Sequence, residues 1–304
     1  MKIYFAPLEG LTDSIYRKLH RKYFPGVDKY FTPFFSPTVH RSLTPKEARE
    51  LPPANTFDGV VVPQILTKNA EDFLWFAGAC RELGYEEVNL NLGCPSGTVF
   101  SKGKGSGMLR EPDALDRFLG EIFAGTPLPI SIKTRLGVES AGEFPAILEI
   151  YNRYPIHELT LHSRVRSQFY KGNTDMEAFR YCLENAKAPV CYNGDLFSAQ
   201  DIERFSSQFP TCKAVMLGRG LIADPGMFGC SENLERFHDE LLSTYITAFG
   251  SERNALFRMK ENWFYLLPTF EGSDKLGKKL RKCTDIAEYR TITREIFETL
   301  PRIK

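Results

Sequence analysis

The sequence contains no long apolar run and no cysteine pattern typical of disulfide-bonded or zinc-binding proteins. Its longest apolar runs, such as residues 60–63, are far shorter than the ~20 residues of a membrane helix. The N-terminus has no signal-peptide core, because its first apolar residues lead straight into Ala6 and Pro7. The seven cysteines form no CxxC pair, which argues against a disulfide framework and a structural zinc site. We therefore expect a cytoplasmic protein with reduced thiols, no metal and no membrane segment.

An excess of charge of one sign is also absent. The chain of 304 residues has 39 Lys and Arg against 38 Asp and Glu, a net charge of +1. This balance argues against a polybasic binder but leaves room for a local basic patch. The 24 Phe and 13 Tyr supply enough apolar surface for a large core, so global disorder is excluded.

Eight short β-rich segments alternate with segments of helical periodicity. The β-rich segments begin near residues 2, 29, 59, 86, 129, 157, 189 and 213. Residues 69–83 have apolar side chains at helical intervals and are followed by Gly84, a typical C-cap. Another helix is expected to begin at Ser198, with a capping arrangement to Asp201. Eight strand–helix units over about 230 residues predict an α/β fold of the (β/α)8 TIM-barrel type, and a doubly wound sheet with fewer strands is the alternative.

No strand pattern follows the eighth β-rich segment. Three later segments have the apolar periodicity of helices: residues 234–249, 254–267 and 284–300. Thr284 is the expected N-cap of the last one. We predict a catalytic barrel over residues 1–230 and a small C-terminal all-helical domain over residues 231–304.

Polar residues lie near the ends of several predicted strands, on the face that points into the barrel. Side chains alternate between the two faces of a strand, so an outward Ile130 and Ile132 place Lys133 inside. The same alternation brings five polar side chains to one mouth: Gln64, Asn91, Lys133, His162 and Asn193. Taken singly, each has an ordinary structural explanation, as a core histidine, a snorkelling lysine or an amide that ties loops. Together they favour a polar ligand at the mouth where barrel enzymes have their active sites.

Glycines follow the last two predicted strands. Residues 193–195 are Asn-Gly-Asp, and residues 218–220 are Gly-Arg-Gly. Barrels commonly bind phosphate after strands 7 and 8, where Arg219 would add a positive charge, although two ordinary glycine turns are the alternative. No GxGxxG motif follows a strand, which argues against a Rossmann-bound dinucleotide. A mononucleotide such as FMN fits better, with Lys133 against the N1/C2 carbonyl edge of its ring.

A cysteine opens the glycine-rich segment after the fourth predicted strand. Cys94 lies in residues 93–107, which contain five glycines. An ordinary thiol titrates near pH ~8.5 and can therefore donate a proton at neutral pH. A buried inert cysteine is the usual alternative, and it suits the other six cysteines better.

These motifs resemble those of the tRNA-dihydrouridine synthase family. The matching segments occur in the family's order and cover most of residues 1–230. They are residues 6–13, 89–95, 131–135, 161–164, 170–172, 193–195 and 216–220. Two positions depart from the family pattern, because Leu8 replaces a common methionine and Met176 replaces a common tryptophan.

The resemblance implies an FMN-binding barrel followed by a helical RNA-binding domain. It implies that NADPH reduces the flavin, that hydride passes from flavin N5 to C6 of a flipped uridine, and that Cys94 protonates C5. Asn91 and Arg164 match substrate contacts. The positions that match cofactor contacts are Ala6, Pro7, Leu8, Gln64, Lys133, His162, Asn193, Gly194, Asp195, Gly218 and Arg219.

The C-terminal segment carries a local basic cluster. From residue 251 to residue 304 there are 12 Lys and Arg against 8 Asp and Glu, a net charge of +4. Within it, Lys278, Lys279 and Lys282 are candidates for contacts with RNA phosphates, and a solvated helix face is the alternative. We expect tRNA as the partner, with ribosomal RNA as a second candidate, and a monomeric protein.

Three functions are compatible with these features. The first is NADPH-dependent reduction of a uridine in RNA to 5,6-dihydrouridine. The second is a flavin-dependent dehydrogenase of a free pyrimidine or another small molecule, in which the helical domain and the basic cluster would have no purpose. The third is a non-catalytic RNA-binding protein on a decayed barrel, which would not take up FMN.

Overall fold

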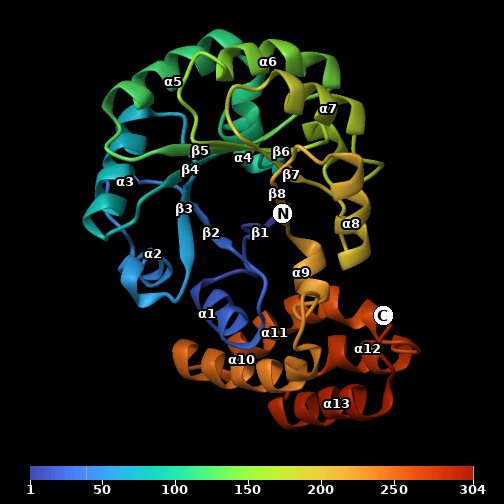
Figure 1. The fold of residues 1–304 in the computed structure, drawn as a ribbon. Coiled ribbons are helices and arrows are strands. Elements are labelled where there is room, and N and C mark those ends of the chain that lie inside the picture. Colours follow the sequence, from blue (N-terminus) through green and yellow to red (C-terminus); the bar gives the residue numbers. More distant parts are fainter. Residues whose placement is uncertain (39, 304) are drawn as a thin grey trace. The chain divides into compact units, whose positions relative to one another are not determined.

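The computed structural model describes residues 1–38 and 40–303. Val39 and Lys304, the last residue of the predicted helical domain, lie outside the described residues. Eight parallel strands form a closed barrel in which each strand pairs with the next along the chain and β8 pairs with β1 (Figure 1). The strands are β1 (Lys2–Phe5), β2 (Lys29–Phe35), β3 (Val60–Ile65), β4 (Val88–Leu92), β5 (Ile130–Arg135), β6 (Glu158–His162), β7 (Val190–Asn193) and β8 (Ala214–Leu217). The predicted (β/α)8 barrel is confirmed.

Helices alternate with the strands and then continue alone. Those that precede or follow the strands are α1 (Ser14–Tyr23), α2 (Pro45–Glu50), α3 (Ala70–Glu82), α4 (Gly97–Ser101), α5 (Pro112–Gly125), α6 (Phe144–Tyr151), α7 (Met176–Asn185), α8 (Ala199–Gln208) and α9 (Arg219–Ala223). The C-terminal ones are α10 (Leu234–Phe249), α11 (Glu252–Leu266), α12 (Asp274–Lys282) and α13 (Ile286–Thr299). Short 3-10 turns include η2 (Gly105–Arg110) and η4 (Arg166–Gln168).

The chain forms two compact units. The first contains Met1–Pro7, Asp28–Asp195 and Ile202–Leu217, and therefore all eight strands. The second contains Leu8–Val27, Leu196–Asp201 and the chain from Gly218 onward, and therefore α1 and α9 to α13. The functional division at residue 230, into a catalytic and an RNA-binding domain, stays a prediction.

Local sequence signals set several helix ends. Helix α3 begins after Asn69, whose side chain accepts a hydrogen bond from Asp72 N at 2.9 Å, and Gly84 follows its end with φ +85°. Ser198 Oγ accepts from Asp201 N at 3.1 Å, so the expected cap of α8 is confirmed.

The expected cap of α13 was wrong by one residue. Asp285, not Thr284, is the N-cap of this helix, and its carboxylate accepts from Glu288 N at 2.9 Å. A carboxylate has an advantage over a hydroxyl here, because its negative charge also lies at the positive end of the helix dipole.

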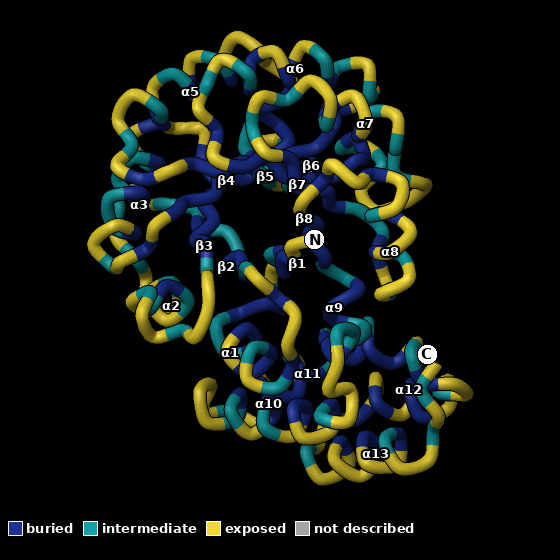
Figure 2. The backbone as a smooth tube through the Cα atoms, viewed as in Figure 1, coloured by how far each residue is buried: buried dark blue, intermediate teal, exposed yellow. Residues whose placement is uncertain are grey.

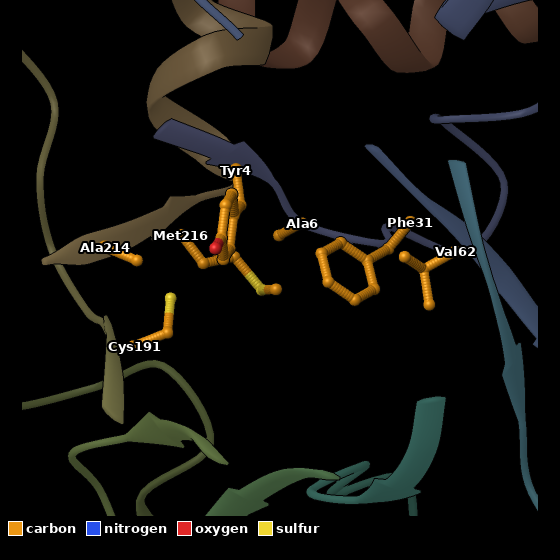
Figure 3. Packing of buried hydrophobic residues seen from close by; sticks show 7 residues of the cluster. All are labelled: Tyr4, Ala6, Phe31, Val62, Cys191, Ala214 and Met216. Atoms are coloured by element: carbon orange, nitrogen blue, oxygen red, sulfur yellow. The ribbon is translucent and has the colours of Figure 1, made fainter. Parts of the chain in front are cut away.

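Inward side chains fill the middle of the barrel. Figure 3 shows seven of them, contributed by β1, β2, β3, β7, β8 and the segment after β1, and the strands are buried along most of their length (Figure 2). The seven are Tyr4, Ala6, Phe31, Val62, Cys191, Ala214 and Met216. The outward residues, among them Ile130 and Ile132, are also buried, as expected for strands covered on both faces.

The N-terminal end of the barrel contains a compact ionic cluster. Lys29 Nζ lies 2.9 Å from Glu87 Oε2 and 3.4 Å from Glu158 Oε2, and Tyr4 OH donates to Glu158 Oε1 at 2.8 Å. Although burial opposes it, the attraction of the two carboxylates raises the pKa of Lys29. Tyr4, Lys29 and Glu158 are paired within this cluster, while Glu87 Oε1 is buried without a hydrogen-bond partner among the described residues. The polar residues predicted to bind a ligand lie at the opposite end of the barrel.

The second unit has its own core around Trp263. Its indole N–H donates to Tyr289 OH at 2.8 Å, and Tyr289 OH lies 2.7 Å from His238 Nε2. Three helices, α10, α11 and α13, are joined by these buried contacts. Among the helices that the structure describes, none combines the length and apolar character needed to cross a membrane.

Candidate active site

A chain of side-chain hydrogen bonds runs across β3, β4 and β5 to the loop that carries Cys94. Asn89 Nδ2 donates to Ser131 Oγ at 2.8 Å, and Gln64 Nε2 donates to Asn89 Oδ1 at 2.7 Å. Asn91 Nδ2 donates to Gln64 Oε1 at 2.8 Å, while Asn91 Oδ1 accepts from Cys94 N at 2.9 Å. The four side chains are buried, so the backbone of Cys94 is held by an internal network.

Two backbone donors fix the orientation of the Asn91 amide, and this in turn fixes the next amide along the row of hydrogen bonds. The N–H groups of Gly93 and Cys94 both point at Asn91, so the oxygen of Asn91 faces them and its NH2 group faces Gln64. Gln64 must then turn its oxygen to Asn91 and its NH2 group to Asn89. Reversing one amide would oppose buried donors, at about 1–3 kcal/mol for each unsatisfied group.

The carbonyl side of Cys94 is held as well. Ser106 Oγ donates to Cys94 O at 2.7 Å. Gly105 has φ +57°, and a Cβ there would lie 3.1 Å from Cys94 Cβ and 3.0 Å from Val99 Cγ1. The glycine-rich segment is therefore a folded support for Cys94, in which a glycine is required by both backbone conformation and space.

Most of the other cysteines are structural thiols. Burial raises the pKa of five of them: Cys80, Cys182, Cys191, Cys212 and Cys283. Cys230 is exposed, and Cys94 is half-buried at the C-terminal end of a barrel strand. Cys94 is thus the thiol whose position suits chemistry at the barrel mouth.

Arg135, the last residue of β5, ties the loop after β4 to the loop after β6. Its Nε donates to Gly93 O at 2.9 Å, and its two terminal nitrogens donate to Val165 O at 3.0 Å and Phe169 O at 2.8 Å. Burial lowers the pKa of Arg135 to about 10, which leaves it cationic at neutral pH. The sequence prediction missed this residue, although it lies two positions after Lys133 and so on the same inward face.

Lys133 belongs to a second polar connection, across β5, β7 and β8. Lys133 Nζ donates to Asn193 Oδ1 at 2.8 Å, and Asn193 Nδ2 donates to Met216 O at 2.8 Å. Burial, with a smaller contribution from the charge of Arg135, lowers the pKa of Lys133 to about 7. Near neutral pH the amine can therefore gain or lose a proton readily.

His162 and Asp195 are joined by Arg164. The Arg164 guanidinium forms an ion pair with Asp195, including a bond from Nη1 to Oδ1 at 3.1 Å, and its Nη1 lies 3.3 Å from His162 Nε2. Because a guanidinium only donates, His162 Nε2 accepts, and the proton of a neutral His162 lies on Nδ1.

Arg164 was predicted to contact substrate, but the structure gives its side chain an exposure of 0%. Its Nη2 also donates to Gly172 O at 2.6 Å. These internal partners explain why the guanidinium is buried, since a buried charge must be paired. In this position the Arg164 guanidinium contacts His162 and Asp195 and is not exposed at the surface.

Three other predicted cofactor residues belong to the barrel unit. A Cβ at Gly194 would lie 2.0 Å from Tyr192 OH, so this position accepts glycine alone. Ala6 is buried in the cluster of Figure 3, and Pro7 is half-buried. The glycine at position 194 lets the Tyr192 side chain pack against the backbone that follows β7.

The remaining predicted residues belong to the second unit. Leu8 N donates to Thr12 Oγ1 at 2.8 Å, and Gly218 precedes the five-residue helix α9. The guanidinium carbon of Arg219 lies 5.4 Å from the centre of the Phe197 ring. The three lysines predicted to bind RNA are exposed on α12: Lys278, Lys279 and Lys282.

The barrel unit thus brings together the inward polar residues of five strands, β3 to β7, and Cys94 in the loop after β4. Sequence reasoning did not assign roles to Asn89, Ser131, Ser106 or Arg135. The alternation of side chains along a strand placed Asn89 inside the barrel, and it points Ser131 inward as well. The hydrogen-bond partners of these residues, however, depend on which strands become neighbours. Among the described residues, no group of three or more His, Cys, Asp or Glu side chains is arranged to hold a metal ion.

The fold and the site define a parallel (β/α)8 barrel with a thiol, an amine and an imidazole at the C-terminal ends of its strands. The model of the dihydrouridine synthase (Dus) family matches residues 4–294. The chain belongs to this family.

Relatives include three proteins described as tRNA-dihydrouridine synthases. Synthase B of Pasteurella multocida is 27% identical over 234 residues, which cover 77% of this chain and 69% of the relative. The tRNA-dihydrouridine(16) synthase of Neisseria meningitidis serogroup B is 26% identical over 315 residues, covering 97% and 94%. That of Escherichia coli is 28% identical over 242 residues, covering 75% and 74%.

Solved structures share the barrel at low sequence identity. Histamine dehydrogenase from Rhizobium sp. 4-9 has a TM-score of 0.54 at 13% identity, over 77% of this chain and 45% of that one. Morphinone reductase has a TM-score of 0.51 at 12% identity, over 77% and 85%. At these identities the similarity concerns the fold alone.

Proposed function

We propose that this protein reduces a uridine in tRNA to 5,6-dihydrouridine, with NADPH as reductant and FMN as bound cofactor. Membership of the dihydrouridine synthase family and the names of its relatives support an oxidoreductase that acts on tRNA. The observation that carries the proposal is the buried amide chain that ends on the backbone of Cys94. We expect the protein to act as a monomer in the cytoplasm.

The donor set at the barrel mouth fits the acceptor edge of a flavin. Lys133 supplies an amine, His162 supplies Nδ1–H, and both lie near the C-terminal ends of their strands. Flavin carbonyl and ring nitrogen atoms accept hydrogen bonds, and a protonated Lys133 would offset negative charge on the reduced ring. When bound, the flavin would supply the hydride that is added to C6 of uracil.

Cys94 is the proposed proton donor to C5 of the uracil. The amide of Asn91 and the hydroxyl of Ser106 hold its backbone on both sides, which limits the positions available to the thiol. Asn91 Nδ2 carries a second N–H, and this is the group proposed to contact the uracil. Such positioning lowers the barrier because the proton donor is already in place when the base arrives.

Two predicted contact residues have different proposed roles. Both polar ends of the Gln64 side chain are occupied by Asn89 and Asn91, and the residue is fully buried. We assign Gln64 to positioning of the Cys94 loop, and Arg164 to orientation of His162. Leu8, Gly218 and Arg219 remain candidates for the cofactor from sequence, as Asp195 does for its sugar–phosphate tail.

The Cys94→Ala variant tests the proposal. It should retain bound flavin and NADPH oxidation but lose formation of dihydrouridine in unmodified tRNA, because the proton donor is gone while the donor set for the flavin is intact. A drop of about 10²-fold or more is expected for a positioned acid. Flavin spectra, NADPH oxidation and dihydrouridine content of the tRNA are the measurements.

Controls separate the competing functions. Cys230→Ala, at an exposed cysteine of the second unit, should behave like the parent protein. Reduction of free uridine in preference to tRNA would indicate a small-molecule dehydrogenase. A colourless protein that binds RNA but takes up no FMN would indicate a decayed barrel, and loss of flavin from Cys94→Ala would contradict the role given to Cys94.

A further inference from the structure

Two phenylalanine side chains of α11 are directed into solvent. Phe257 is 68% exposed and Phe264 is 74% exposed, the two largest values among the exposed large hydrophobic residues of the described chain. Trp263, on the same helix, is 2% exposed and fills the core of the second unit. Helix α11 therefore has a complete buried face, and the two exposed rings are not needed for it.

The two rings lie on one face of the helix. They are seven positions apart in the sequence, which corresponds to about two turns and a rise of about 10 Å along the axis. Lys260 lies between them, three residues after Phe257 and four residues before Phe264, and so on the same side of the helix. The three residues form a stripe, which we call the α11 stripe.

A basic helix end lies beside the α11 stripe. Lys260 Nζ donates to Arg281 O at 3.1 Å and also to Cys283 O, which brings the last turn of α12 against the middle of the stripe. The side chains of Arg281 and Lys282 are exposed there.

The nearest acid on α11 is already engaged. Glu261 Oε2 lies 3.2 Å from Arg258 Nη1. Exposed rings are thus combined with the exposed cations at the end of α12.

This combination matches the chemistry of unpaired nucleotides. An aromatic side chain can stack on any base, and cations beside it can pair with the phosphates that link the bases. A purely apolar partner would leave the cations of α12 without counter-charges, and a duplex would hide its base faces inside the helix.

We propose that the α11 stripe and the last turn of α12 bind an unpaired segment of the RNA substrate, whose bases stack on Phe257 and Phe264. The proposal rests on the proposed function for the identity of the RNA. It adds two aromatic contacts to the lysine cluster, which alone would bind any polyanion. Binding should therefore favour single-stranded RNA over a duplex of equal charge.

Three double variants at the two positions test the proposal in the full-length protein. Phe257→Ala with Phe264→Ala removes the rings, Phe257→Leu with Phe264→Leu keeps apolar surface without a π-face, and Phe257→Trp with Phe264→Trp keeps stacking. Tyr181→Ala is the matched control, because Tyr181 is a 39% exposed aromatic residue of the barrel helix α7. Since both sites are exposed, the substitutions should leave the fold intact, which circular dichroism and bound flavin would verify.

The measurements are Kd values at a fixed salt concentration for unmodified tRNA transcript, a 20-nucleotide single strand and a 20-base-pair RNA duplex. The Ala and Leu variants should bind tRNA and the single strand about 5-fold or more weaker for each ring removed, with little change for the duplex. The Trp variant and Tyr181→Ala should bind as the parent does, and NADPH oxidation should be equal in all.

Three results would overturn the proposal. The first is equal loss for single strand and duplex, and the second is full binding by the Leu variant. The third is a concentration-dependent dimer that the Ala variant abolishes, which would identify the stripe as a contact between two copies of the chain. If the parent protein forms no dihydrouridine but the Kd differences hold, the proposed function fails and the RNA surface stands.

Discussion

At the scale of single residues, backbone conformation and space can be separated at two glycines. Gly105 and Gly250 have φ values of +57° and +59°. A Cβ at Gly105 would press on Val99 and Cys94, whereas no described heavy atom comes within 4 Å of a Cβ at Gly250. Both positions require the left-handed region, but only Gly105 also requires the absence of a side chain.

Gly105→Ala should therefore cost more than Gly250→Ala. We expect Gly250→Ala to lower the free energy of unfolding by about 1–2 kcal/mol, through backbone strain alone. Gly105→Ala should lower the free energy of unfolding by more than this. It should also slow the reduction of uridine in tRNA, because relief of the close contact moves Cys94. Urea unfolding and the rate of dihydrouridine formation measure the two effects. Equal losses in both variants would show that the support of Cys94 tolerates a methyl group.

Lys133 gives a second prediction, on pH dependence. Burial lowers its pKa to about 7, whereas the unfolded chain has a lysine pKa near ~10.4. Between these values the unfolded state binds a proton that the folded state lacks, so the free energy of unfolding rises with pH. In flavin-free protein, Lys133→Met should remove this rise, which is at most about 1.4 kcal/mol per pH unit and smaller where water reaches the half-buried amine.

Urea unfolding of both proteins at pH 7 and pH 9 checks this. The parent should be more stable at pH 9, and the Met variant should gain stability chiefly at pH 7. Parallel pH profiles for the two proteins would show that Lys133 remains protonated in the folded state.

At the scale of elements, the short helix α4 is held by aromatic contacts with arginines. The Phe100 ring centre lies 4.4 Å from the guanidinium carbon of Arg110, in η2, and 4.1 Å from that of Arg166, in η4. Since α4 begins three residues after Cys94, these contacts connect the Cys94 loop with the loop after β6. Each is worth about 0.5–2 kcal/mol, depending on its exposure to water.

Phe100→Leu should weaken this connection. We expect kcat for the reduction of uridine in tRNA to fall about 5- to 30-fold, because the loop that carries the proposed proton donor becomes less ordered, with flavin affinity unchanged. Phe100→Tyr keeps the ring and should restore the rate. Phe123→Leu, at a half-buried phenylalanine of α5 that stacks on Tyr154, is the control. An unchanged kcat in Phe100→Leu would remove the ring from the support of Cys94.

At the scale of the whole molecule, the two units contain different titrating groups. His20, on α1 in the second unit, is fully buried, and this burial lowers its pKa to about 3. The unfolded chain has a histidine pKa near ~6.5. Below that pH the unfolded state takes up a proton that the folded state refuses, so stability falls as the pH falls from about 6.5 toward 3.

His20→Gln should make the free energy of unfolding less dependent on pH below about pH 6.5. In the parent, the free energy of unfolding should decrease by at most about 1.4 kcal/mol per pH unit between pH 6 and pH 4 from this group. Trp263, in the core of the second unit, provides the fluorescence signal once Trp75 of the barrel unit is replaced by Phe. His157→Gln, at an exposed histidine, should leave the slope unchanged. A slope that persists in His20→Gln would assign acid sensitivity to another group.

Much of the fold followed from local pattern. The alternation of strands and helices specified eight units, and the alternation within strands placed Gln64, Asn91, Lys133, His162 and Asn193 on inward faces. These are properties of neighbouring residues, so they can be read without knowing which strands meet. The N-cap at Ser198 was predictable for the same reason. The N-cap of α13 was predicted one residue too early, at Thr284 in place of Asp285, because both residue types can cap a helix.

The partners of the polar residues did not follow from pattern. The bond from Gln64 to Asn89 spans 25 residues, and that from Lys133 to Asn193 spans 60. Whether Arg164 faces RNA or Asp195, and whether Phe257 is buried or exposed, depends likewise on what other segments occupy the space around them. Their sequence neighbours carry no information about this.

The sequence by itself determined the order of elements, the inward faces of the strands and the position of Cys94 after the fourth strand, because these follow from periodicity and chain order. Only the tertiary structure decided that the amides join into a single chain of hydrogen bonds, that Arg135 connects two loops and that two phenylalanines remain outside. Closure of the barrel brings strands distant in sequence into register, and the choice of hydrogen-bond partners is made there.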